Sequence, residues 1–174
     1  LSNPQFKGLV TSGHVFTYGD YLDYGGVITE NERRAALING DIKANLFFQQ
    51  MNYKQDVAIL ELNESPVLSS NYISFAKGYY TVKDSDLKTS TANVIITSRQ
   101  NNTRPAFILD YNVSFTINYF NAPQIIRNII LIGSTNDRAT SKTVTIGGDS
   151  GSCVYHQASG KLIGMLLGGN NKFS

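Results

Sequence analysis

The chain has 174 residues, of which 41% are hydrophobic and 16% are charged, a mixture that can bury a core and excludes disorder as the main state. The 15 Lys and Arg against 13 Asp and Glu leave a net charge of +2 without a basic run, so we expect neither nucleic acid nor a membrane as a partner. No segment reaches the roughly 18 consecutive apolar residues of a membrane-spanning helix.

The apolar runs are short, rich in β-branched and aromatic residues, and bounded by turn residues, which is the pattern of an all-β protein. In chain order they predict strands at Gly8–Phe16, Ala44–Gln49, Asp56–Leu62, Ile73–Tyr80, Ala92–Ser98, Ala106–Asp110, Val113–Phe120, Asn128–Gly133 and Lys161–Leu167. This many strands in a chain of this length fits two small barrels or a sandwich.

One short helix is predicted at Glu30–Ile38. Thr29 and Glu32 form a capping-box pattern at its start, and Gly40 follows its end. Its apolar content is low, so we expect it to lie on the surface within a loop.

The polar segment Lys83–Ser90 is the best candidate for a linker. It divides the chain into two parts of similar length, residues 1–83 and 84–174. Each part holds enough predicted strands for one small β-barrel.

Cys153 is the only cysteine, and His14 and His156 are the only histidines. The chain therefore cannot form an internal disulfide or the usual four-ligand zinc site, and we expect no cofactor. The single cysteine favours an intracellular location, but secreted proteins without disulfides exist, so the compartment stays open.

A candidate nucleophile lies in the sequence Gly148-Asp149-Ser150-Gly151. A catalytic serine needs a base within hydrogen-bond reach and backbone N–H groups directed at the oxyanion. Small flanking residues allow a tight turn that presents both, and the N–H groups of Gly148 and Ser150 can converge on one point. By itself the tetrapeptide is equally compatible with an ordinary glycine-rich turn.

A candidate base, His14, follows a predicted strand through the small residues Ser12 and Gly13. Histidine gains and loses its proton near neutral pH, so it can act as both base and acid. The alternative is a half-buried structural histidine. It is disfavoured because the chain has only two histidines and this one has small neighbours after a strand.

A candidate carboxylate, Asp56, lies at the start of a strongly apolar strand. A buried carboxylate is unfavourable unless it is paired, and pairing with an imidazole N–H would leave the other ring nitrogen free as a base. The alternative is a surface aspartate that begins a strand.

Three segments, Thr11–His14, Asp56–Leu60 and Gly148–Gly151, resemble the signature blocks of the chymotrypsin-like serine proteases and follow one another in that family's order of His, Asp and Ser. The resemblance implies two six-stranded antiparallel β-barrels with the active site in the cleft between them. The base and the carboxylate would come from the first barrel and the nucleophile from the second. Without a disulfide, the chain resembles intracellular fungal and viral members more than digestive enzymes.

The same resemblance implies a substrate-binding edge and pocket. Leu167, Gly168 and Gly169 would pair with the substrate backbone, and the floor of the pocket would lie near Val144. No acid occurs in residues 141–147, so a requirement for Lys or Arg before the scissile bond is disfavoured. The two glycines would leave the pocket mouth open, which favours an apolar side chain of medium or large size.

Asp149 is expected to hold the oxyanion loop without transferring a proton. Only 13 residues precede His14, which argues against activation by a new N-terminus inserted beside Asp149. Arg127 or Arg138 is expected to neutralise its charge instead.

The sequence departs from the family pattern at several positions. Ser152 and Cys153 replace a glycine and a proline, and Leu167 replaces a serine that contacts the catalytic carboxylate. Cys153 lies outside the tight turn and is expected to be a buried structural thiol, not a nucleophile. His156 is expected in a hairpin turn. The chain starts at Leu1 and stops shortly after the substrate-binding edge, so we expect one or both ends to be processed or disordered.

The leading hypothesis is a serine endopeptidase, with a polypeptide substrate and the removed remainder of its own precursor as partners. The alternative is a protease-like module that binds peptides or processes only itself, with little turnover in trans. An unrelated β-sandwich adhesin remains if the three segments do not converge in space.

Overall fold

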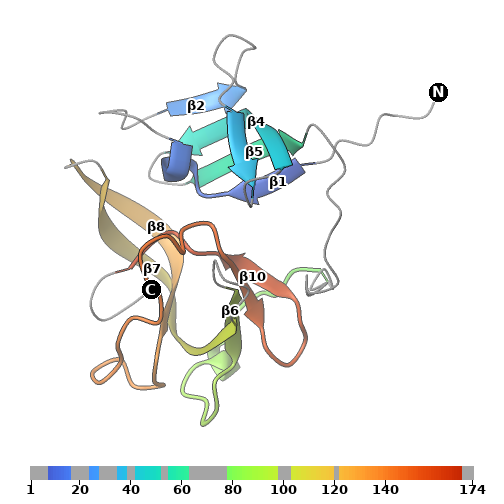
Figure 1. Ribbon diagram of the computed structural model, residues 1–174. Coiled ribbons are helices and arrows are strands. Elements are labelled where there is room, and N and C mark those ends of the chain that lie inside the picture. The colour runs from blue at the N-terminus through green and yellow to red at the C-terminus, as the bar shows by residue number, and fades with distance from the viewer. Residues whose placement is uncertain are drawn as a thin grey trace.

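The computed structural model describes residues 8–16, 24–27, 35–38, 42–51, 55–62, 78–97, 103–119 and 122–169. Within these ranges the protein is all-β, as predicted: two five-stranded sheets are joined by turns and two short 3-10 helices, without an α-helix. Figure 1 shows the earlier sheet, coloured blue to teal, above the later one, coloured green to red. No helix in the described part of the chain is long and apolar enough to cross a membrane.

The first sheet comprises β1 (Gly8–Thr11), β2 (Tyr24–Val27), β3 (Ala35–Ile38), β4 (Ile42–Met51) and β5 (Asp56–Leu62). Its strands are antiparallel in the order β1-β5-β4-β2, and β3 also pairs with β4. Burial alternates along β5, so that Asp56 shares the buried face with Ala58 and Leu60. This alternation places a carboxylate on the core side of the strand, where it needs a partner.

The second sheet comprises β6 (Val94–Thr97), β7 (Thr103–Tyr119), β8 (Ala122–Gly133), β9 (Cys153–His156) and β10 (Leu162–Met165). Its strands are antiparallel in the order β10-β9-β6-β7-β8. Buried residues from these strands form its core together with Leu166, which directly follows β10. The chain just beyond β10 is therefore held against the sheet, while residues 134–152 form the long loop that carries the Ser150 motif.

The helix prediction for Glu30–Ile38 is wrong where it can be compared. Ala35–Ile38 is strand β3, which pairs with β4 from Ala35 opposite Asn45 to Ile38 opposite Ile42; residues 30–34 lie outside the described part. The sequence Asn39-Gly40 between these strands is a strong signal for a β-hairpin, which competes with the interpretation of Gly40 as the residue after a helix. Pairing with β4 outweighs the capping-box pattern.

Most of the predicted strands are present. The observed β5 has the predicted bounds, while β4, β6, β8 and β10 overlap their predictions, and β7 joins two predicted runs into one long strand. The predicted strand Gly8–Phe16 ends at Thr11, and a 3-10 helix, η1 (Gly13–Phe16), follows. Of the strand predicted at Ile73–Tyr80, only residues 78–80 are described, and Tyr79 forms a single parallel bridge with Leu162. Tyr24–Val27 was not predicted as a strand.

The predicted linker Lys83–Ser90 lies between the last strand of the first sheet and the first strand of the second. It contains a short 3-10 helix, η3 (Asp84–Asp86). The buried Asp86 carboxylate accepts hydrogen bonds from the Tyr80 hydroxyl, at 2.9 Å, and from the Lys83 N–H, at 2.8 Å. Tyr80 N–H in turn bonds the Leu162 carbonyl of β10, so this segment is attached to the second sheet. The domain boundary itself stays a prediction.

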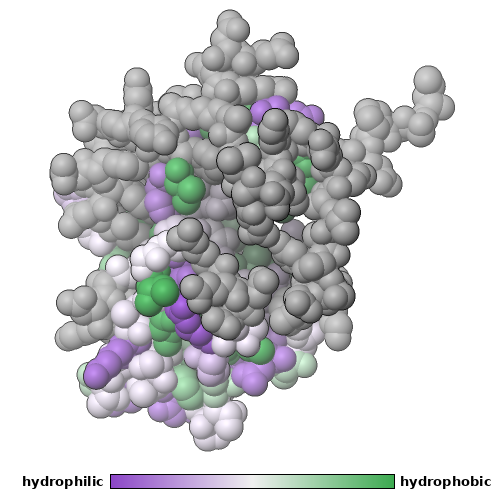
Figure 2. Space-filling model, in the orientation of Figure 1, coloured by the Kyte–Doolittle hydropathy of each residue, from purple (hydrophilic) through white to green (hydrophobic). Residues whose placement is uncertain are grey.

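Figure 2 shows the same view as a surface, in which coloured hydrophobic residues are interspersed with hydrophilic ones. Among the described residues, the large hydrophobic side chains that are exposed come from scattered parts of the chain: Leu9, Val10, Val15, Tyr79, Ile125 and Ile146. Val15 directly follows His14, and Ile146 lies four residues before Ser150. Two of these exposed side chains therefore belong to the segments that carry the predicted catalytic residues.

Candidate active site

His14 and Asp56 form a tight pair at one end of the first sheet. Strand β1 pairs with β5, which places the η1 turn beside the start of β5. The Asp56 side chain is buried, its Oδ2 lies 2.6 Å from His14 Nδ1, and its Oδ1 accepts the His14 backbone N–H at 2.8 Å. One carboxylate therefore positions both the backbone and the ring of His14. This pairing favours the tautomer with its proton on Nδ1, in which Nε2 is the basic nitrogen.

Gly13 allows this close approach. A Cβ at Gly13 would lie 2.9 Å from the Gln50 carbonyl oxygen, which is closer than real Cβ atoms come, and 3.0 Å from Asp56 Oδ1, which is tighter than most real contacts. The buried side chain of Gln49 donates a hydrogen bond of 2.7 Å to the Gly13 carbonyl. Gln49 was not predicted as a site residue. In the sequence it is one of four polar residues of β4, and nothing distinguishes it from the neighbouring Gln50.

Ser150 lies in a tight turn between two glycines with left-handed backbone conformations. Gly148 has φ of 93° and Gly151 has φ of 83°, a region that favours glycine. Within the described part of the chain, the backbone N–H groups of Gly148 and Ser150 donate no hydrogen bond. Both groups are therefore the candidates for an oxyanion-binding site.

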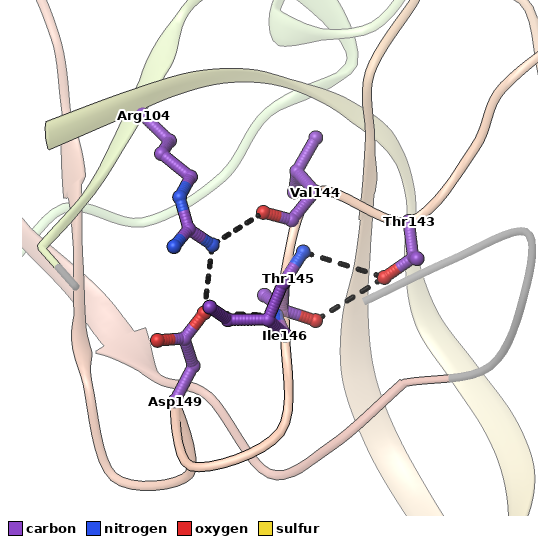
Figure 3. Close-up of polar contacts among 6 residues, drawn as sticks. All are labelled: Arg104, Thr143, Val144, Thr145, Ile146 and Asp149. Atoms are coloured by element: carbon purple, nitrogen blue, oxygen red, sulfur yellow. Dashed lines mark hydrogen bonds and ion pairs between the residues drawn. The ribbon is translucent and has the colours of Figure 1, made fainter. Parts of the chain in front are cut away.

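Asp149 anchors this turn through Arg104, as Figure 3 shows. Arg104 Nη1 lies 2.8 Å from Asp149 Oδ2 and donates a second hydrogen bond to the Val144 carbonyl, at 3.0 Å. The same Oδ2 accepts the Ile146 N–H at 3.0 Å. Asp149 is only 2% exposed, so a buried charge is matched by a cation and a backbone donor.

The expectation that Arg127 or Arg138 neutralises Asp149 is therefore wrong, because Arg104 does so. Arg138 instead pairs with Asp110 on the surface, at 3.0 Å, and Arg127 is exposed on β8. Arg104 lies 45 residues before Asp149, on β7, and nothing in its local sequence sets it apart from the other arginines. Only the packing of the long loop against β7 selects it.

A pocket of about 340 Å³ opens beside Ser150. One side is formed by residues 143 and 145–150 and the other by Leu166, Gly168 and Gly169. Gly168 and Gly169 were predicted here. Val144, expected at the floor, packs against the core of the second sheet, and the adjacent Thr143 and Thr145 line the pocket instead. Alternation along an extended segment explains this, because neighbouring side chains point to opposite sides.

Leu167, Cys153 and His156 do not line this pocket. Leu167 is partly buried beside the pocket-lining glycines. Cys153 is the first residue of β9, and its side chain is only half-buried, so the expectation of a buried thiol is wrong in this respect. Burial, followed by a hydrogen bond with Cys153, raises the pKa of Tyr155. His156 ends β9 at a hairpin, where its ring stacks on Tyr80 at 3.8 Å, and its Nδ1 lies 2.9 Å from Ser159 Oγ.

The His14 turn and the Ser150 turn meet where the two sheets adjoin. The buried Ser12 hydroxyl donates a hydrogen bond of 2.9 Å to the Leu166 carbonyl, which also accepts the Gly151 N–H at 2.9 Å. The three segments singled out in the sequence therefore converge. Within the described part of the chain, Ser150 itself makes no hydrogen bond, so its bond to His14 is not formed in this structure. Such catalytic contacts are often long without substrate and shorten when it binds.

A comparison with known protein families finds no family model that matches the chain, and a comparison with curated proteins finds no match either. The candidate site therefore stands on the sequence motifs and on the geometry described above.

Proposed function

We propose that the protein is a serine endopeptidase with a chymotrypsin-like double β-barrel, in which residues 1–83 and 84–174 form the two barrels. The observation that carries the proposal is the buried Asp56 carboxylate, which holds both the N–H and the ring of His14 on a turn that adjoins the Ser150 turn. Neither a surface aspartate nor an isolated structural histidine requires two hydrogen bonds from one buried carboxylate. The pocket and the unused N–H groups beside Ser150 support the same function.

The proposed reaction proceeds through an acyl-enzyme. Ser150 Oγ attacks the peptide carbonyl while His14 Nε2 takes its proton, and the C–O bond forms as the carbonyl becomes an oxyanion. The N–H groups of Gly148 and Ser150 stabilise that oxyanion, each by about 3–4 kcal/mol in comparable sites. His14 then gives the proton to the leaving amine as the C–N bond breaks. A water molecule, activated by His14, releases the acyl group and restores Ser150.

The function is tested by labelling with a fluorophosphonate, which reacts with activated serines. We expect the native protein to be labelled and the Ser150→Ala variant to remain unlabelled, because phosphonylation requires the Ser150 oxygen. Intact mass spectrometry measures the addition. If neither protein is labelled, the endopeptidase proposal fails and the cleft is better described as a peptide-binding module. Labelling of both would show that another side chain reacts.

The pocket predicts a preference for an uncharged, apolar residue before the scissile bond. Asp149 is the only charged residue among those that line the pocket, and its carboxylate is buried and paired with Arg104. A lysine or arginine side chain would therefore lose its hydration without gaining a free carboxylate. Cleavage of a peptide library, read by mass spectrometry, should show Leu, Met or Phe at this position. Predominant cleavage after Lys or Arg would contradict the prediction.

A further inference from the structure

Ser12 neither lines the pocket nor takes part in the proposed proton transfer, yet its side chain joins the two sheets. It lies between β1 and η1, two residues before His14, and it is 0% exposed. Its Oγ donates a 2.9 Å hydrogen bond to the Leu166 carbonyl, 154 residues later in the chain. This bond joins the turn that carries His14 in the first sheet to the chain that follows β10 in the second sheet.

Leu166 is closely tied to the nucleophile turn. Its carbonyl accepts the Gly151 N–H at 2.9 Å, and its own N–H donates to the Ser152 carbonyl at 2.9 Å. These two bonds lie on the C-terminal side of Ser150, immediately after the nucleophile. Ser12 therefore bonds the same oxygen atom that fixes the residue next to Ser150.

The turn that carries His14 and the turn that carries Ser150 are in close contact at Gly151. A Cβ at Gly151 would overlap the Thr11 hydroxyl and would lie 3.1 Å from the Ser12 backbone nitrogen. The two turns therefore touch directly, and small residues on both sides permit the approach. A hydroxyl at Ser12 can reach across the contact without separating the sheets.

We propose that Ser12 is a positioning residue that aligns His14 with Ser150. This inference rests on the endopeptidase function proposed above. Asp56 fixes His14 relative to the first sheet, and Leu166 fixes the Ser150 turn relative to the second, so the distance between base and nucleophile depends on how the two turns are held together. A misplacement of about 1 Å in such a pair can slow a reaction about 10²-fold. The Ser12–Leu166 bond restricts that displacement.

The test compares Ser12→Ala with Thr97→Val in the full chain. The Thr97 hydroxyl also donates to a carbonyl, that of Cys153 at 3.2 Å, but this bond lies within the second sheet. We expect Ser12→Ala to lower kcat and the rate of fluorophosphonate labelling about 10- to 100-fold with KM nearly unchanged, because alignment and not binding is lost. Thr97→Val should keep both rates within about twofold of the native protein. Thermal unfolding shows whether the two variants lose similar stability.

The outcomes separate the inference from the proposed function. Native labelling with an unchanged rate in Ser12→Ala overturns the positioning role and leaves the endopeptidase in place. Equal slowing in both variants also overturns it, because a general loss of stability would then explain the effect. If the native protein is not labelled, the proposed function fails. Hydrogen exchange then tests whether Ser12 links the two turns. Faster exchange of residues 9–15 and 148–153 together in Ser12→Ala supports the link, and unchanged exchange refutes it.

Discussion

Replacing Asp56 by asparagine is expected to lower turnover about 10⁴-fold while the fold is retained. The Asp56 carboxylate accepts two hydrogen bonds from His14, one from the backbone N–H and one from Nδ1. An asparagine side chain has only one oxygen to accept a bond, and its NH₂ group would favour the tautomer in which Nδ1 accepts. His14 Nε2 would then carry the proton and could not act as the base. Steady-state kinetics on peptide substrates, with the protein concentration measured independently, give the change in kcat.

Asp86→Asn is a matched control for this variant. Asp86 is a second buried aspartate that accepts a backbone N–H and a side-chain donor, but it lies in the segment between the sheets. We expect Asp86→Asn to lower thermal stability, with turnover within about threefold of the native value. Turnover in Asp56→Asn within tenfold of the native protein would refute the assigned role of Asp56.

Replacing Arg104 by alanine is expected to lower kcat by about 10²- to 10³-fold and to destabilise the protein by about 3 kcal/mol. The change leaves the Asp149 carboxylate buried without its cation and removes a donor to the Val144 carbonyl. The loop that bears Gly148 then loses the contacts that hold its shape, so the proposed oxyanion donor is displaced. The destabilisation lies near the lower end for a buried pair because the Arg104 side chain is 29% exposed. Activity measurements and urea unfolding check the two effects.

Arg138→Ala provides the control, since Arg138 also pairs with an aspartate but lies on the surface with 56% of its side chain exposed. Exposed pairs contribute about 0–1 kcal/mol, so this variant should keep both stability and activity. Arg104→Lys tests the charge itself, because an ammonium group can reach the carboxylate without the planar geometry of a guanidinium. We expect it to restore part of the activity lost in Arg104→Ala. Native activity in a folded Arg104→Ala variant would show that Arg104 does not support the oxyanion loop.

Local patterns were sufficient for part of the fold. Strand β5 has the predicted bounds because the apolar run Val57–Leu60, which includes two β-branched residues, follows Asp56 directly, and Leu62 extends it beyond Glu61. Strand β3 was predicted as a helix because its few residues carry no clear period and the flanking pattern suited a helix cap. Its pairing with β4 supplies the backbone hydrogen bonds that decide its conformation. Closure of each sheet into a six-stranded barrel stays a prediction.

The sequence by itself determined which chemical groups the candidate site contains. A histidine after small residues, an aspartate at the head of an apolar strand and a serine between glycines each have a local pattern, since the proposed chemistry requires such neighbours. The structure brings the three segments together, and two of the predicted pocket residues, Gly168 and Gly169, line the cavity beside Ser150.

Only the tertiary structure identified the residues that hold these groups in place. Gln49, Arg104 and Ser12 contact partners 36, 45 and 154 residues away, and each bond exists because packing buries a polar atom beside one particular acceptor. A buried polar group must find a partner, but the sequence does not say which one lies within reach. The sequence offers no reason to prefer Arg104 over Arg127 or Arg138. Only the packing of the loop against β7 shows that Arg104 neutralises Asp149.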